Sequence, residues 1–472
     1  MSQYSNESDS KLLEKFGYKQ DLKRSMKRFS SFAISFSLIS ILTGISANFH
    51  YGYTQVQGFV IFSWLLVFCG QFLVALVMSD LAVRYPLSGY GYQWASRLVN
   101  SKLGFATGWL LLMQFLTGFP GICKALGIIL SDFFLQFLSF EINSTLIAIG
   151  FIWIIAFIHK RGIKIVSHIN NLGVITEIIG VVIVILLLSY FLNENTNEIA
   201  FKGLYNDFNF SEINLKSFAL SILLGAWCLT GFEAAADMSE ETKNPRGIVP
   251  KSIINSLLYS GFFGLIIILL AVVFLQKEAY LNAESENLLY DLFIFEFGKE
   301  LFLFVLIFII AAIFACAVAC MATASRLIFS MSRDSVLPQS NWLKSVDKNK
   351  SPSNSIYIIS LLGSFFILFF KEIEIITSVS AICGYIGYCG IIFSSFFTNR
   401  ETGIKSFYFS KFQTPIKIIS ILWCLFVVIC LIAPGQNIEG FSTEYIPAIS
   451  TFVFLVIGYL IYLIRNRAIF QS

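Results

Sequence analysis

Residues 35–46 read SFSLISILTGIS, and residues 224–233 read LGAWCLTGFE. Each lies within a long apolar run and places glycine and hydroxyl residues near its middle. A helix that breaks at mid-depth in a membrane must line protein or a water-filled cavity, because lipid offers the freed backbone groups no hydrogen-bond partner. Close helix packing explains a single glycine equally well, but the two clusters together favour a binding site between two discontinuous helices.

The composition identifies the chain as a membrane protein. Of its 472 residues, 56% are hydrophobic and only 13% are charged, whereas about a quarter of the residues in a soluble domain are charged. The apolar runs are long enough to cross a hydrocarbon core of about 30 Å as helices. We therefore predict an all-α integral membrane protein without a large soluble domain. Its twelve predicted transmembrane helices are residues 29–50, 57–78, 104–130, 144–158, 167–192, 217–239, 252–276, 300–331, 355–370, 374–397, 415–433 and 446–464.

The distribution of Lys and Arg predicts the orientation of the chain. If the N-terminus is cytoplasmic, all but six of the 33 Lys and Arg residues lie on the cytoplasmic side. The exceptions are Lys124 within the third span and, in the outer connections, Lys202, Lys216, Lys277, Lys299 and Lys371. Both termini are therefore expected in the cytoplasm, and the first apolar run is expected to be retained. The net charge of +4 reflects this topology and gives no reason to expect a nucleic-acid partner.

Residues that could carry enzyme chemistry are sparse. A polytopic membrane enzyme needs a nucleophile, an acid–base pair or a metal cluster on one loop face, and the sequence has no His-rich cluster and no phosphate-binding glycine loop. None of His50, His159 and His168 is expected deep within a span, so we predict no metal site and no cofactor. The nine cysteines all fall within spans, where they are expected to be reduced packing residues.

Four blocks of sequence resemble a known family. They are GYKQD at 17–21 with FSSFAISFSLISILTG at 29–44, SDLAVRYPLSGYGYQW at 79–94, GFEAAADMSEETKNPRGIVP at 231–250 and ASRLIFSMSRDSVLP at 324–338. In these blocks the chain resembles the amino acid, polyamine and organocation permease superfamily, and most closely its amino acid and choline transporter branch. The resemblance implies two inverted repeats of five helices, with helices 1 and 6 discontinuous across the substrate site. It implies a cytoplasmic tail at 1–28, a ten-helix transport core at 29–397, two additional helices at 398–464 and a cytoplasmic tail at 465–472.

The predicted substrate site joins the two broken helices. Free N–H groups at one helix end can hold a carboxylate and free C=O groups at another can hold an ammonium, so amino-acid-like zwitterions are favoured over sugars and inorganic ions. The ring of Trp227 suits both a cation and an apolar side chain. The residues expected to surround the ligand are Ser40, Thr43, Gly44, Trp227, Thr230 and Gly231.

Charged residues within spans are functional candidates, because an unpaired charge in the membrane is costly. Glu177, about ten residues into the fifth span, is the predicted proton-linked coupling residue, and a permanently paired structural charge is the competing interpretation. The resemblance implies that this position lies against spans one and eight, where relatives hold a sodium ion or a charged side chain. Glu233 and Asp237 follow the break in span six. Lys124 lies near the outer end of span three, where snorkelling to the interface explains it equally well.

Charges of both signs gather in the cytoplasmic connections. A solvated set of loops explains them, and so does an ion-pair network that closes an inner gate, although exposed pairs alone contribute only about 0 to 1 kcal/mol. The candidate gate residues are Asp80, Arg84, Glu240, Glu241, Arg326, Arg333 and Asp334.

The predicted function is secondary transport across the cytoplasmic membrane, by symport or antiport. The expected substrate is an amino acid, γ-aminobutyrate, choline or a polyamine-like amine, and the expected coupling ion is H+ or Na+. An amino-acid sensor built on a transporter scaffold is the main alternative, and a polytopic membrane enzyme is a weaker one.

Overall fold

The computed structural model describes residues 13–195, 214–275, 288–370, 372–398, 412–432 and 445–471. Within these ranges the regular structure is helical, apart from one isolated bridge between Met26 and Thr242. The helices are α2 (Arg28–Ile39), α3 (Ile41–Val56), η1 (Gln57–Phe59), α4 (Val60–Arg84), α5 (Tyr90–Leu98), α6 (Ser101–Leu138), α7 (Ser144–Lys160), α8 (Ile163–Asn195), α10 (Leu215–Cys228), α11 (Ala234–Asp237), α12 (Pro245–Leu275), α14 (Leu288–Arg333), α15 (Ser340–Leu343), α16 (Ser353–Phe369), α17 (Ile373–Ser395), α18 (Gln413–Ile432) and α19 (Ile446–Gln471).

Each of the twelve predicted spans contains helix, and spans one and six are each interrupted, at Ser40 and at residues 229–233. Eight helical stretches in the described part are long and apolar enough to cross a membrane, and the first, Arg28–Arg84, covers predicted spans one and two. Three shorter apolar helices, α7, α10 and α16, correspond to spans four, six and nine. The all-α, multi-span prediction is therefore confirmed. Residues 276 and 433 at the ends of two spans, and Lys202, Lys277 and Lys371 in outer connections, lie outside the described residues.

The first predicted break lies at Ser40, between α2 and α3. The Ser40 backbone has φ 31° and ψ 98°, which is not a helical conformation. Its side-chain oxygen accepts the N–H of Thr43 at 3.4 Å and shares a 2.6 Å hydrogen bond with the Thr43 hydroxyl. Ser40 therefore ends α2 and caps the N-terminus of α3, as short hydroxyl residues commonly do.

The second predicted break covers residues 229–233, between α10 and α11. Gly231 has φ +99°, a left-handed conformation that glycine adopts without strain. A Cβ at this position would also lie 2.6 Å from the Leu38 side chain. The hydroxyl of Ser35 donates to the Phe232 carbonyl at 2.7 Å and accepts the N–H of Ala235 at 2.9 Å, which ties α2 to α11.

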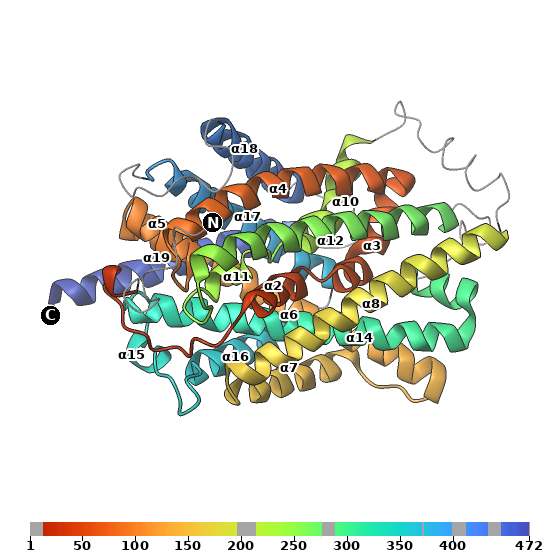
Figure 1. Ribbon diagram of the computed structural model, residues 1–472, viewed down its shortest axis with the longest axis horizontal. Helices are drawn as coiled ribbons and strands as arrows, with labels where there is room; N and C mark the ends of the chain where they lie inside the picture. The colour runs from red at the N-terminus through yellow and green to blue at the C-terminus, as the bar shows by residue number, and fades with distance from the viewer. Residues whose placement is uncertain are drawn as a thin grey trace.

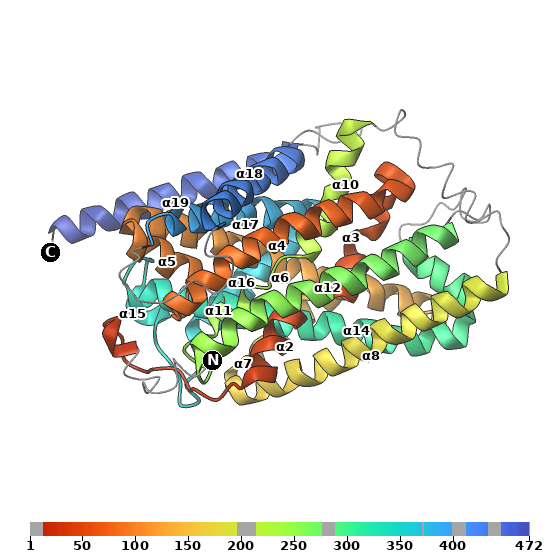
Figure 2. The same cartoon turned by 45° about the horizontal axis from the view of Figure 1, so that its top comes forward.

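The two breaks lie in the interior of the bundle, between the half-helices α2 and α3 and between the half-helices α10 and α11. α3 packs closely on α10 because Gly44 faces Cys228, where a Cβ would lie 2.2 Å from the cysteine sulfur. Helices α6, α8, α14 and α17 contact the half-helices. In Figure 1, α18 lies at one edge of the bundle and α7 at the opposite edge, and in the turned view of Figure 2, α19 runs beside α18. Both breaks are therefore enclosed by protein, as the absence of hydrogen-bonding partners in lipid requires.

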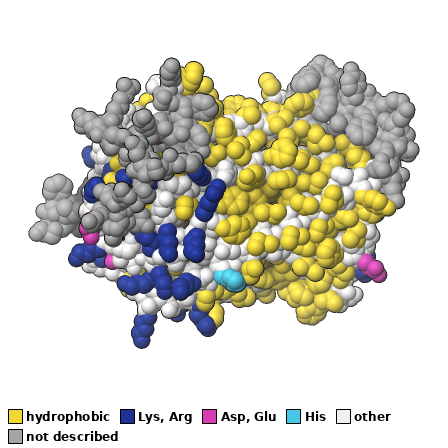
Figure 3. Space-filling view, viewed as in Figure 1, with side chains coloured by type: hydrophobic (Ala, Val, Ile, Leu, Met, Phe, Trp, Pro, Cys, Tyr) yellow, Lys and Arg dark blue, Asp and Glu magenta, His cyan; other side chains and the backbone are white. Residues whose placement is uncertain are grey.

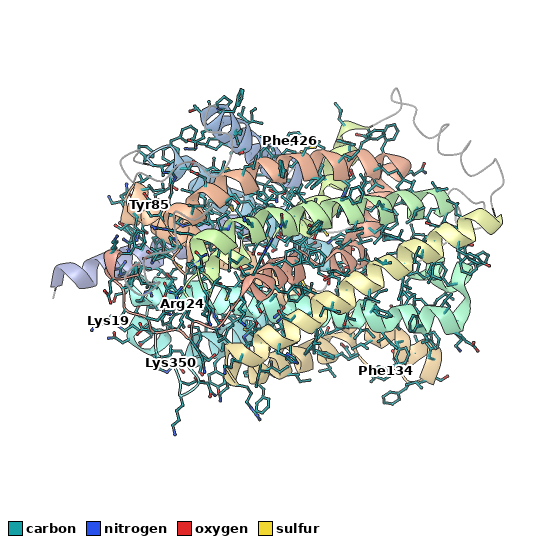
Figure 4. The ribbon with its side chains drawn as sticks, viewed as in Figure 1. Lys19, Arg24, Tyr85, Phe134, Lys350 and Phe426 are labelled. Carbon is teal, nitrogen blue, oxygen red and sulfur yellow. The ribbon has the colours of Figure 1, made fainter. Side chains whose placement is uncertain are left out.

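One end of the bundle is rich in positive charge. On the face in view, the Lys and Arg side chains gather there, beside a hydrophobic belt (Figure 3). Lys19, Arg24, Tyr85 and Lys350 lie at this end, and Phe134 lies toward the other (Figure 4). We call the end marked by Lys19, Arg24 and Lys350 the basic end.

Candidate functional site

A small buried cavity lies between the two broken helices. It is lined by Leu38, Ile39 and Thr43 at the first break, by Trp227, Thr230 and Gly231 at the second, and by Gln114, Phe115, Gly118, Ile122, Cys316, Cys320 and Ser380 from α6, α14 and α17. The volume of the cavity is about 30 Å³, which is room for about one or two water molecules. A ligand of amino-acid size therefore requires the surrounding helices to move apart.

Four of the six predicted ligand-binding residues line this cavity, namely Thr43, Trp227, Thr230 and Gly231. The other two lie directly behind the lining. Ser40 shares a hydrogen bond with the Thr43 hydroxyl, and Gly44 packs on Cys228. The structure thus brings all six together at the breaks, while their contact with a ligand stays a prediction.

The cavity residues on the unbroken helices have weak signals or none in the sequence. Ser380 of α17 donates its hydroxyl to the Gln114 carbonyl of α6 at 2.9 Å, which joins two walls of the cavity. The Cys316 sulfur lies 3.3 Å from the Leu38 carbonyl, at the C-terminal end of α2. Gly118 alone has a signal in the sequence, because residues 116–118 repeat the Leu-Thr-Gly triplet that occurs at 42–44 and 229–231 at the two breaks.

Glu177 lies against the first break and is wholly buried. The polar groups that it faces are the Ser40 hydroxyl and the N–H groups of Ile41 and Leu42, which open α3 and form the positive end of that helix. Among the described residues, neither Glu177 oxygen completes a hydrogen bond of ordinary geometry. Helix α8 packs on α2, α3 and α14, so the expected contact of span five with spans one and eight is confirmed. A buried carboxylate with open oxygen atoms is a position that a proton or a cation can occupy.

Glu233 and Asp237 are buried between the cavity and the basic end. Glu233 accepts the N–H of Gly231 at 3.1 Å and the Tyr388 hydroxyl at 2.7 Å. Asp237 accepts the N–H of Gly89 at 2.5 Å, and its second oxygen has no hydrogen bond to the described residues. Both carboxylates are thus held by neutral donors, which leaves their charge without a directly bonded cation in the described part of the chain.

Lys124 lies apart from the cavity. Its ammonium donates to the hydroxyls of Ser144 and Thr145, at 3.2 Å and 3.0 Å, where α7 begins. It also faces Glu372 at the start of α17. These contacts belong to the end of the bundle opposite the basic end, and a part for Lys124 in coupling stays a prediction.

Two buried ion pairs join the segment after α11 to the end of α14. Arg326 binds both oxygens of Glu241, at 2.9 Å and 3.1 Å, and both side chains are fully buried. Arg333 binds both oxygens of Glu240, at 2.9 Å and 2.8 Å. The hydrogen bonds of such bidentate ion pairs are strong and directional. These residues therefore differ from the solvated loop charges of the alternative interpretation.

Asp334 and Asp80 form separate contacts at the same end. Asp334 accepts hydrogen bonds from the Tyr92 hydroxyl at 2.8 Å and the Gln93 amide at 2.9 Å. Asp80 pairs with Arg84 at 2.9 Å, one turn along α4. Five of the seven predicted gate residues therefore form one cluster near α14, and the Asp80–Arg84 pair lies within a single helix.

The segment before α2 covers this cluster. The Tyr18 hydroxyl donates to Asp334 at 2.8 Å, and the Arg333 guanidinium lies 3.7 Å from the centre of the Tyr18 ring. Arg24, labelled in Figure 4, donates to the Thr242 carbonyl at 2.7 Å. Burial raises the pKa of Tyr18 and the Asp334 carboxylate raises it further, so the Tyr18 hydroxyl stays a donor at neutral pH. The sequence alone does not indicate this contact between the N-terminal segment and α14.

His159 lies in the last turn of α7, at the end of its span, and its side chain is fully buried there, with Nε2 3.0 Å from the Val318 carbonyl. The reason is that α14 and the segment before α16 cover the end of α7, where the Ser351 hydroxyl donates to the His159 carbonyl at 2.9 Å. No group of three His, Cys, Asp or Glu residues that could hold a metal occurs in the described ranges.

The fold and the cavity define the class of protein. A multi-pass bundle of apolar helices with two broken helices at a central cavity is the arrangement of a secondary transporter. The model of the amino acid permease family matches residues 26–462, and the chain belongs to this family. It is therefore a multi-pass membrane protein that transports amino acids or related amines.

Curated relatives agree with this assignment. Amino-acid permease BAT1 of Arabidopsis thaliana is 26% identical over 96% of this chain and 94% of its own length. An uncharacterized amino-acid permease of Schizosaccharomyces pombe is 26% identical over 96% of this chain and 86% of its own length. The low-affinity putrescine importer PlaP of Escherichia coli is 22% identical over 61% of this chain and 62% of its own length.

Proposed function

We propose that the chain is a secondary active transporter that carries an amino acid or a related amine across the plasma membrane by alternating access. The observation that carries the proposal is the cavity between the broken ends of α2–α3 and α10–α11. Helix ends that meet at a cavity supply opposite partial charges without any ionised side chain. This is the chemistry that a zwitterion needs.

The ligand's two charged groups have complementary partners at the breaks. The N-terminal end of α3, with the Thr43 hydroxyl, suits a carboxylate, and the C-terminal ends of α2 and α10 suit an ammonium. The carbonyls of Leu38 and Ile39 support the second assignment, because the groups that approach them are thiols, which are weak donors. Trp227 is the wall against which the rest of the ligand packs.

Glu177 is the proposed coupling residue, with a proton as the coupling ion and exchange as the alternative mode. Support comes from its burial against the N-terminal end of α3, the same helix end that suits a substrate carboxylate. A negative charge on Glu177 competes with that carboxylate, and a proton on Glu177 removes the competition. A sodium ion at the same oxygens would have an equivalent effect. Glu233, Asp237 and Lys124 are secondary candidates.

The buried cluster of Glu240, Glu241, Arg326, Arg333 and Asp334 is the proposed cytoplasmic gate. This assigns the basic end to the cytoplasm, with both termini there, as the excess of Lys and Arg favours. Transport is assigned to the ten-helix core at 29–397. The segment 398–464 adds two further helices, and 1–28 and 465–472 are the cytoplasmic tails.

A thermal-unfolding panel on the purified protein tests the site. Amino acids, γ-aminobutyrate, choline and putrescine are each added, because a ligand that binds the folded state raises the unfolding temperature by mass action. At least one should stabilise the wild type, and Thr43→Val, which alters the cavity wall, should weaken that effect. Thr54→Val is the matched control, since the Thr54 hydroxyl bonds only carbonyls of its own helix, α3, away from the cavity. Equal stabilisation of both variants by the ligand would place the binding site elsewhere.

A further inference from the structure

A second, larger hollow lies on the outside of the bundle, between α2 and α12. Its volume is about 330 Å³, and its lining includes Arg28, Phe29 and Phe32 of α2 and Lys251, Asn255 and Tyr259 of α12. We call these six residues the α2–α12 groove. Both helices lie on the face drawn in Figure 1, and on that face Lys and Arg side chains border the hydrophobic belt (Figure 3).

The polar part of the groove is positively charged. Arg28 and Lys251 contribute two cations, and no acidic side chain is among the described residues that line the groove. In the described part of the chain, neither cation takes part in an ion pair or a hydrogen bond. The first turn of α2 also lacks an acidic residue and a side-chain cap. This part of the groove is therefore suited to an anion.

The remaining part of the groove is aromatic. The rings of Phe29 and Phe32 lie 6.4 Å apart, and Phe32 meets Tyr259 edge to face at 6.0 Å. Phe29 is 44% exposed and Tyr259 is 50% exposed, which leaves a wide apolar surface next to the two cations. An anion that bears a long apolar chain matches both parts, whereas a small hydrated anion matches only one.

We propose that the α2–α12 groove binds an anionic phospholipid, with its phosphate at Arg28 and Lys251 and an acyl chain along Phe29, Phe32 and Tyr259. Basic pockets between transmembrane helices at the cytoplasmic side suit such headgroups. The Asn255 amide lies beside Lys251, one turn along α12, and adds a neutral donor for the phosphate or glycerol oxygens. The lipid would contact two helices. One is α2, the half-helix that precedes the first break, and the other is α12, which follows the second break.

Lipid binding to the full-length protein in detergent micelles tests the proposal. Native mass spectrometry and thermal unfolding are recorded with phosphatidylglycerol and with phosphatidylcholine of identical acyl chains. Phosphatidylglycerol should bind at least tenfold more tightly and should raise the unfolding temperature. Lys251→Gln and Arg28→Gln should each weaken phosphatidylglycerol binding about fivefold, and together about twentyfold or more. Lys164→Gln is the matched control, since Lys164 is an exposed lysine at the start of α8, outside the groove.

Three outcomes overturn the proposal. The first is equal binding of the two lipids. The second is phosphatidylglycerol binding that is as strong in the double variant as in the Lys164→Gln control. The third is stabilisation by inorganic phosphate alone to the same extent and with the same dependence on Arg28 and Lys251, which identifies a site for a free anion. Tyr259→Ala tests the acyl-chain contact separately from the phosphate contact. It should weaken phosphatidylglycerol binding without creating any affinity for phosphate. None of these readouts depends on transport, so a failure here leaves the proposed function untouched.

Discussion

At the scale of single residues, Glu177 and Trp227 occupy different positions relative to the cavity. Trp227 lines the cavity, whereas Glu177 lies behind it, against the N–H groups that open α3. In the proposed mechanism, Trp227 contributes an aromatic face to the ligand, and Glu177 contributes a carboxyl group that acts on the N-terminal end of α3. Their substitutions should therefore alter different steps, namely ligand affinity and coupling.

Trp227→Leu keeps the bulk of the side chain and removes the aromatic face. Affinity for a cationic ligand should fall by about 0.5 to 2 kcal/mol, which is the range for a cation over an aromatic ring. The affinity is measured by the ligand-dependent shift of the unfolding temperature or by radioligand binding. Trp227→Phe keeps an aromatic face and should therefore lose less affinity for the ligand. Unchanged affinity in Trp227→Leu would assign Trp227 to packing alone.

Glu177→Gln imitates the protonated carboxylic acid and cannot release a proton. Uptake driven by a pH gradient should fall to background in this variant, while exchange of labelled for unlabelled substrate should remain measurable. Uptake and exchange are both followed in proteoliposomes. Glu141→Gln removes an exposed carboxylate and should leave both activities unchanged. If Glu177→Gln still accumulates substrate with the wild-type response to the proton gradient, Glu177 is not the coupling site.

At the scale of elements, the N-terminal segment and α14 act together at the basic end. Tyr18 bonds Asp334 and underlies Arg333, and Arg333 in turn binds Glu240. If this cluster is the proposed gate, an alternating-access cycle must separate these groups when the basic end opens. Weakening the cluster should then make the cavity accessible from that end more often.

Tyr18→Phe tests this arrangement by removing a single hydroxyl. The variant keeps the ring under Arg333 but loses the hydrogen bond to the Asp334 carboxylate. A hydrogen bond to a charged group contributes about 1.5 to 3 kcal/mol. The ratio of open to closed inner gate should rise about tenfold or more. Because Cys316 and Cys320 line the cavity and are buried, their rate of modification by a thiol reagent reports the opening. Tyr357→Phe is the control, since the Tyr357 hydroxyl accepts from Lys160 on the surface of the same end. Equal labelling of the two variants would contradict a gating role for Tyr18.

The elements also show how far the sequence could lead. The breaks at Ser40 and Gly231 were predictable because small and hydroxyl residues at mid-depth leave a local pattern along the chain. Gln114, Cys316 and Ser380 were not, since they lie on regular helices and reach the cavity only through packing. The burial of His159 has the same cause, because neighbours distant in sequence cover it. For the gate, charges of both signs indicated a network, but the choice of partners needed the fold.

At the scale of the whole molecule, the cavity is smaller than a ligand, and buried ion pairs join the segment after α11 to α14 at the basic end. Binding must therefore be coupled to movement of the half-helices. We therefore expect the protein to exchange its ligand across the membrane and not only to bind it.

Exchange in proteoliposomes tests this claim most directly. Vesicles that contain the purified protein are loaded with an unlabelled ligand that stabilises it, and the entry of labelled ligand is followed with the ion gradients dissipated. We expect saturable entry of labelled ligand that requires internal ligand and that is absent from protein-free vesicles. If neither exchange nor net uptake occurs for any ligand that stabilises the protein, the chain is a sensor and not a transporter.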